Sequence, residues 1–265
     1  MTRFSRCDRF NVANSTTCVL INEVCEYIHF LSSRIIRWPT ECESQIVAKN
    51  FFKLCGIPDT IGAIDCCHIN ITVPAGQHDS YLDRKFNYSV VLQGICTSKK
   101  LYTNIFVGFP GAAHDSRIST INHVLKESYL NKCIEETGEE RFFYVKYHLI
   151  GDSAYPCKTW LLHLTGLSRV KLRYNIKLGS TRVKIENSFA LLVDRWRILN
   201  FVNVYSIQKV VRIIRACCVL HNYCLLKCDV MDDVNQQVLG YNDPIIYEPE
   251  DHAGLIKRDQ IPRLI

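Results

Sequence analysis

The sequence contains no apolar run near the ~18 residues that a membrane-spanning helix needs. It opens with the polar stretch MTRFSRCDRF, so no signal peptide is expected. A GxSxG nucleophile elbow and a P-loop GxxxxGKS/T are both missing, and no two CxxC pairs offer zinc spacing. We therefore expect no membrane association, and the sequence gives no support for an unrelated α/β hydrolase or a P-loop enzyme.

Cysteine is abundant, with 14 residues among 265, but the chain is not a small disulfide scaffold. Because 48% of its residues are hydrophobic, it can bury one substantial core, and we expect mostly buried free thiols in a reducing compartment. Cys217, His221, Cys224 and Cys228 recur every three or four residues, which is one face of a helix. Four ligands along one helix cannot surround a tetrahedral ion, so core packing is the expected role.

Charge is distributed unevenly along the chain, whose net charge is +6. Residues 229–265 contain eight acidic and three basic residues, which leaves +11 on residues 1–228. A body this basic suits a polyanion such as DNA, although a basic surface can also simply be solvated. The acidic segment 229–265 has three prolines and few aromatic residues, so we expect a poorly ordered tail.

Hydrophobic periodicity predicts helices near the N-terminus, at 15–34 and 41–54, within a helical segment 1–56. β-branched and aromatic stretches then predict strands at TIGAIDCCHINITV, YSVVLQGICT, LYTNIFVGF and, as a short buried strand, YHLIGDSAY.

The second half of the chain is expected to be mainly helical. We predict a helix over 115–129, a basic loop region over 165–180, an amphipathic helix from Ser180, and a last helix over 207–226. The order of strands and helices predicts an α/β domain over residues 57–228, in which helices flank a mixed sheet.

Three acidic residues occupy unusual places in this pattern. Asp65 interrupts an apolar strand, Asp152 ends the apolar strand HLIGD, and Glu186 lies beside Ile185 at the edge of a core-facing stripe. A buried carboxylate is costly unless it is paired, hydrogen-bonded or bound to metal. The ordinary alternative is a strand-end turn acid at Asp65, a turn cap at Asp152, and a helix salt bridge from Glu186 to Arg182.

Such acids can form a metal site if they converge. Two Mg²⁺ or Mn²⁺ ions ~3.5 to 4 Å apart take hard oxygen ligands, and activate a water or 3′-hydroxyl without a general-base histidine. His68 follows Asp65 by three residues, so strand alternation places it on the opposite face of the sheet.

Five motifs occur in the order found in PIF/Harbinger-type transposases: GAIDCCHI, VGFPGAAHDS, IGDSAYP, TRVKIENSFALLVDRWRIL and ACCVLHN. The chain therefore resembles that family from about Pro58 to Asn222. The resemblance implies a ribonuclease H-like fold and a metal-dependent, DNA-cutting nuclease whose catalytic, metal-binding acids are Asp65, Asp152 and Glu186. It also implies a nuclear location, a Myb-like DNA-binding partner and a candidate homo-oligomer.

The chain departs from the family at a few positions. Cys66 and Cys67 follow the first acid, where the family usually has glycine and threonine, and Ala190 stands where glycine is frequent. The alternative function is therefore a catalytically silent DNA-binding or scaffold protein on the same fold. Asp115 is a candidate further metal ligand by resemblance, and a helix cap otherwise.

Basic residues precede and enter the helix of the third acid, and we predict that they neutralise DNA phosphates. They are Arg169, Lys171, Arg173, Lys177, Arg182 and Lys184. Tyr174 among them could stack on an unpaired base.

The N-terminal stretch NVANSTTCVLINEVCEYI resembles the turn and second helix of the family's helix-turn-helix. Since only about ten residues precede it, we expect an incomplete reader of DNA sequence, or else a helix packed on the catalytic domain. Either alternative predicts DNA binding with little sequence preference.

Overall fold

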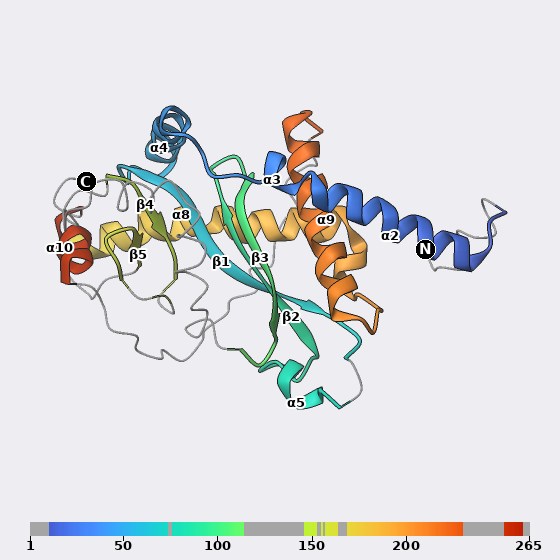
Figure 1. Ribbon diagram of the computed structural model, residues 1–265. Coiled ribbons are helices and arrows are strands. Elements are labelled where there is room, and N and C mark those ends of the chain that lie inside the picture. Colours follow the sequence, from blue (N-terminus) through green and yellow to red (C-terminus); the bar gives the residue numbers. More distant parts are fainter. Residues whose placement is uncertain are drawn as a thin grey trace, which may run out of the picture.

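A five-stranded mixed sheet forms the centre of the computed structural model, in the order β3-β2-β1-β4-β5 (Figure 1). The structure describes residues 11–73, 76–113, 146–152, 155, 157–163, 169–229 and 252–261. The strands are β1 (Thr60–Asn70), β2 (Ser89–Cys96), β3 (Tyr102–Pro110), β4 (His148–Ile150) and β5 (Leu161–Leu162).

The strand directions match the predicted fold class. β2 pairs antiparallel with β1 and with β3, whereas β4 pairs parallel with β1 and with β5. Residues 97–101 join β2 to β3 by a short connection, which permits antiparallel pairing, whereas the longer segment 71–88 joins β1 to β2. A mixed sheet of this order flanked by helices is an α/β arrangement of the ribonuclease H-like type, as the sequence predicted.

The helices surround this sheet (Figure 1). They are α2 (Asn14–Phe30), α3 (Ser32–Ile35), α4 (Glu41–Cys55), α5 (His78–Tyr81), α8 (Arg169–Arg195), the 3-10 helix η3 (Arg197–Asn200), α9 (Ile207–Leu226) and α10 (His252–Gln260). Helix α4 begins with a capping box between Thr40 and Glu43, and it ends at Gly56, whose φ of 70° is the left-handed conformation that glycine adopts easily. None of the described helices is both long enough and apolar enough to cross a membrane.

Side-chain alternation along β1 creates a hydrophobic layer on each face of the sheet. Ala63 belongs to the layer that contains Ile185 and Phe189 of α8. Its neighbour Ile64 belongs to the layer that contains Ala48 of α4. A strand buried on both sides explains why the TIGAIDCCHI segment is almost continuously apolar.

Helix α8 corrects the prediction of a basic loop over 165–180, because it begins at Arg169. Tyr174, Leu178, Thr181 and Ile185 are buried and recur every three or four residues, so they form one helical stripe. The basic residues between them disguise this periodicity in the sequence.

Helix α10 corrects part of the predicted tail. Ile261, which directly follows α10, is buried in a cluster with Tyr174 and Leu178 of α8, and Leu255 packs against the same cluster. Lys257 donates a hydrogen bond to the carbonyl oxygen of Thr159, 2.9 Å away. The acidic segment therefore contains a docked helix despite its composition.

Helix α2 packs against α9 (Figure 1). Its Glu26 forms an ion pair with Arg212 of α9. This packing is the second of the two alternatives for the N-terminal stretch. The helix predicted over 115–129 lies outside the described residues.

Candidate active site

Asp65 lies in the middle of β1, on the face that α8 covers. Its partner in the neighbouring strand is Gly94. A Cβ atom at Gly94 would lie 3.1 Å from the ring of Phe189 on α8 and 3.0 Å from the ring of Tyr102. The glycine therefore lets α8 pass close over the sheet beside the first acid.

Arg182 of α8 connects the first and third acids. Its Nη2 lies 3.8 Å from Oδ2 of Asp65 and 3.4 Å from Oε1 of Glu186, one helical turn further along α8. The two carboxylate oxygens therefore lie at most about 7 Å apart, the sum of both distances. The salt bridge between Arg182 and Glu186, which was the ordinary alternative to a metal site, is therefore present. Arg182 pairs with Asp65 as well.

The pKa of Asp65 depends on the charges of the other two acids. The pKa of Asp65 is raised from 3.8 to about 7, mainly by burial and next by the charge of Asp152. Arg182 and a hydrogen bond from the backbone N–H of Cys66 oppose this rise, and Glu186 adds to it. Asp152 and Glu186 therefore lie close enough to Asp65 for their charges to raise its pKa.

The donor chemistry of this place fits a divalent cation. All three side chains offer the hard carboxylate oxygens that Mg²⁺ and Mn²⁺ prefer, and mutual repulsion at Asp65 is what a cation would relieve. Within the described ranges, no three His, Cys, Asp or Glu side chains stand as close together as ligands of one ion. Instead, Nη2 of Arg182 contacts both Asp65 and Glu186.

Tyr155 ties the loop of the second acid to the sheet, a role that the sequence did not reveal. Its hydroxyl lies 3.3 Å from Sγ of Cys66 and accepts a hydrogen bond from Nε2 of Gln93, 3.4 Å away. Its backbone N–H donates to the carbonyl oxygen of Asp152. The available signal was the tyrosine of the IGDSAYP motif, three residues after Asp152.

His68 lies on the opposite face from Asp65, as strand alternation predicted. Its Nδ1 is 2.9 Å from Oγ of Ser89, which in turn donates to the buried carboxylate of Asp83. The candidate ligand Asp115 lies outside the described residues.

The predicted phosphate-binding residues all lie on α8 rather than on a loop. The side chains of Arg169, Lys171 and Arg173 lie outside the described part of the chain. The amine of Lys177 lies over Gly56, 2.9 Å from where a Cβ would be. Lys184 is half-buried.

The prediction that Tyr174 stacks on a base is wrong. Its side chain is fully buried, with Leu178 and Ile261 in the same cluster, because it belongs to the core-facing stripe of α8. Among the described residues, its hydroxyl has no hydrogen-bond partner.

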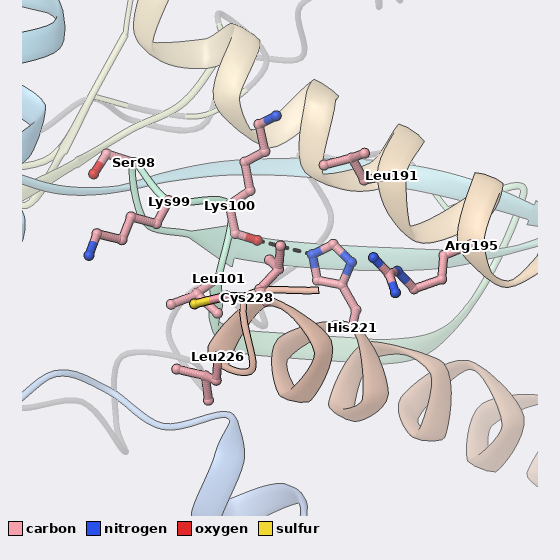
Figure 2. Close-up of a pocket in the computed structure, with 10 residues that line it drawn as sticks. Ser98, Lys99, Lys100, Leu101, Leu191, Arg195, His221, Leu226 and Cys228 are labelled. Carbon is pink, nitrogen blue, oxygen red and sulfur yellow. Dashed lines mark hydrogen bonds between the residues drawn. The ribbon is translucent and has the colours of Figure 1, made fainter. Parts of the chain in front are cut away.

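A cavity of about 410 Å³ lies away from the three acids (Figure 2). Leu191 and Arg195 of α8 line it, and at ~100° per residue they lie ~140° and ~180° around the helix from Glu186. His221 of α9 also lines it and contacts the carbonyl oxygen of Lys100 (Figure 2). Burial lowers the pKa of His221 to about 4, and the residue packs against Tyr102, so its role in the core is confirmed.

Comparisons with known proteins show which family the chain is similar to. The family model described as DDE superfamily endonuclease matches residues 64–222. The protein named "Putative nuclease HARBI1" is 32% identical over 227 residues in Bos taurus and 30% identical over 225 residues in Homo sapiens. These matches cover 83% and 82% of this chain, and 58% and 61% of the relatives.

A plant relative is similar as well. "Protein ALP1-like" of Arabidopsis thaliana is 28% identical over 254 residues, which are 88% of this chain and 59% of the relative. The chain thus spans about three fifths of the length of the curated relatives it matches. No solved structure matches.

The resemblance to Harbinger-type transposases, first indicated by five motifs, is therefore confirmed over most of the chain. The matched region begins at the strand of Asp65 and ends in α9, and thus includes all three acids. The chain belongs to the DDE superfamily endonucleases.

Proposed function

We propose that this chain is a Harbinger transposase-derived nuclease that cuts DNA phosphodiester bonds with divalent metal ions. The observation that carries the proposal is that Nη2 of Arg182 contacts both Asp65 and Glu186, while the charges of Asp152 and Glu186 raise the pKa of Asp65. The family match and the relatives named as nucleases support the same activity.

Asp65, Asp152 and Glu186 are the residues that would hold two Mg²⁺ or Mn²⁺ ions. When bound, such ions activate a water or 3′-hydroxyl and stabilise the leaving oxygen. Asp65 is fixed for this role by its strand and by the N–H of Cys66, 2.8 Å from Oδ1. Tyr155 holds the loop of Asp152 against β1, so the second acid is positioned relative to the first.

DNA would be held mainly through its phosphates. Residues 1–228 carry a net charge of +11, and several of their basic residues lie on α8, the helix that carries Glu186. We also propose a nuclear location and recruitment to specific sites by a Myb-like DNA-binding partner, since phosphate contacts carry no base information.

The deciding experiment is plasmid nicking by the purified chain in Mg²⁺ or Mn²⁺, compared with Asp152→Asn. We expect metal-dependent nicking by the unchanged protein and at least a hundredfold slower nicking by the variant. Matching thermal unfolding of the two proteins would show that the variant is folded.

A catalytically silent DNA-binding protein is the second candidate, because Cys66 and Cys67 replace the small residues that usually follow the first acid. DNA binding that Asp152→Asn leaves unchanged, together with no nicking in either metal, would favour this candidate.

A further inference from the structure

We propose that Arg182 is an internal counter-ion that competes with divalent metal for Asp65 and Glu186, and that DNA phosphates relieve this competition. Metal loading would then depend on DNA. The inference rests on the proposed function and deepens it, since it assigns a regulatory role to one residue of the same site.

The first argument is the position of the guanidinium. Nη2 of Arg182 lies 3.8 Å from Asp65 and 3.4 Å from Glu186, so one positively charged nitrogen contacts two of the proposed metal ligands at once. All three side chains are largely withdrawn from solvent, with 21%, 19% and 30% of their surfaces exposed. A divalent cation bound to both carboxylates would meet a like charge there, at an energetic cost that screening does little to reduce.

The second argument is that Arg182 is held loosely. Charge-assisted hydrogen bonds between arginine and carboxylate are usually about 2.7 to 2.9 Å long. Arg37 and Glu43 form such a pair in this protein, with two contacts of 2.8 and 2.7 Å. Both contacts of Arg182 are longer, and both involve the same nitrogen atom. Arg182 therefore neutralises its carboxylates without the two-pronged geometry that would lock it in place.

The third argument is unused hydrogen-bonding capacity. The Nε of Arg182 is buried and, within the described part of the chain, has no hydrogen-bond partner. A guanidinium presents five N–H donors in a planar fork that fits two oxygens of a phosphate. A phosphodiester beside the acids would therefore be a better partner for Arg182 than the carboxylates it now contacts.

The consequence is thermodynamic coupling between DNA and metal. If DNA draws the Arg182 charge away from Asp65 and Glu186, DNA must raise the affinity for metal, and metal must raise the affinity for DNA by the same factor. In the absence of DNA the site would be kept poor in metal.

The test measures Mn²⁺ binding by the whole chain through the electron paramagnetic resonance signal of free Mn²⁺. We expect Arg182→Gln to bind Mn²⁺ about tenfold more tightly than the unchanged protein without DNA. A short duplex, checked on gels to be intact, should strengthen Mn²⁺ binding about tenfold in the unchanged protein and much less in Arg182→Gln.

Lys209→Gln is the control, since it removes the same charge from an exposed position on α9, and it should bind Mn²⁺ nearly as the unchanged protein does. Arg182→Lys keeps the charge and should keep Mn²⁺ binding weak. Equal or weaker Mn²⁺ binding by Arg182→Gln, or an equal gain in Lys209→Gln, would overturn the counter-ion role.

Failure of the proposed function would look different. Asp65→Asn and Asp152→Asn should each weaken Mn²⁺ binding, in the Arg182→Gln background as well. If neither substitution changes the affinity for Mn²⁺, the metal does not bind at this site. Binding that depends on the acids but not on Arg182 would overturn only the inference about Arg182.

Discussion

At the scale of single residues, Asp65 is the acid of the site whose pKa is raised by its surroundings. Its side chain is largely withdrawn from solvent, the charges of two further acids raise its pKa, and Arg182 compensates them from 3.8 Å away. The pKa of about 7 means that, without metal, this carboxyl holds its proton over a range where an exposed aspartate has lost it. Its ionisation therefore opposes folding.

We predict that Asp65→Asn removes a pH-dependent loss of stability. From about pH 4 to pH 7 the folded protein keeps a proton that the unfolded chain releases, so the free energy of unfolding must fall as pH rises. Asparagine cannot ionise, so by pH 8 the variant should be more stable than the unchanged protein by up to about 4 kcal/mol. Urea unfolding in EDTA at several pH values would measure this, and parallel stability curves would contradict it.

At the scale of elements, the approach of α8 to β1 depends on Gly94. We predict that Gly94→Ala destabilises the fold by about 1 to 3 kcal/mol, because its Cβ would press on the buried rings of Tyr102 and Phe189. Gly179→Ala, within α8 and with nothing within 4 Å of its Cβ, should instead stabilise by up to about 1 kcal/mol. Denaturant unfolding of both variants compares them, and equal effects would refute the close packing.

The docking of α10 can be tested with two isoleucines. We predict that Ile261→Ala costs roughly 2 to 4 kcal/mol of stability, because Ile261 is 5% exposed in the cluster with Tyr174. Ile256→Ala is the control: Ile256 is 43% exposed, so its loss should cost less than about 1 kcal/mol. The midpoint of guanidinium unfolding is the measurement. Similar losses in both variants would mean that α10 does not dock in solution.

These elements also show where sequence reasoning succeeds and fails. Strands β1 to β3 were predictable because each is a stretch rich in apolar β-branched and aromatic residues, which favour strands. The start of α8 and the helix α10 were not, because alternating charges hide their apolar stripes and their burial depends on each other. Arg182 was predicted as a phosphate ligand, but its contact with Asp65 joins residues 117 positions apart, which no local pattern reveals.

At the scale of the whole molecule, the basic body should determine how DNA is bound. We predict that replacing Lys171, Arg173 and Lys177 by glutamine weakens DNA binding about equally on all sequences. The slope of log K against log salt should become shallower by up to about 2.7, since each lost phosphate contact contributes about 0.9. Fluorescence anisotropy at several salt concentrations measures this.

The control for this prediction is the triple replacement of exposed Lys49, Lys53 and Lys209, which removes the same charge from α4 and α9. It should change the slope less. A variant at 171, 173 and 177 that lost its preference for one site while keeping its salt slope would contradict the phosphate role.

Helix α8 is about 40 Å long and contacts other parts of the protein at several points along it. Its first half packs against the cluster with Ile261, its middle crosses β1 and β2, and Arg195 at its end bonds the carboxylate and the carbonyl oxygen of Asp229. Opening the middle of this helix would expose its own buried residues and those of β1 and β2 beneath it. The turn that carries the third acid is therefore expected to open only together with the core, so the site should persist as long as the folded core does.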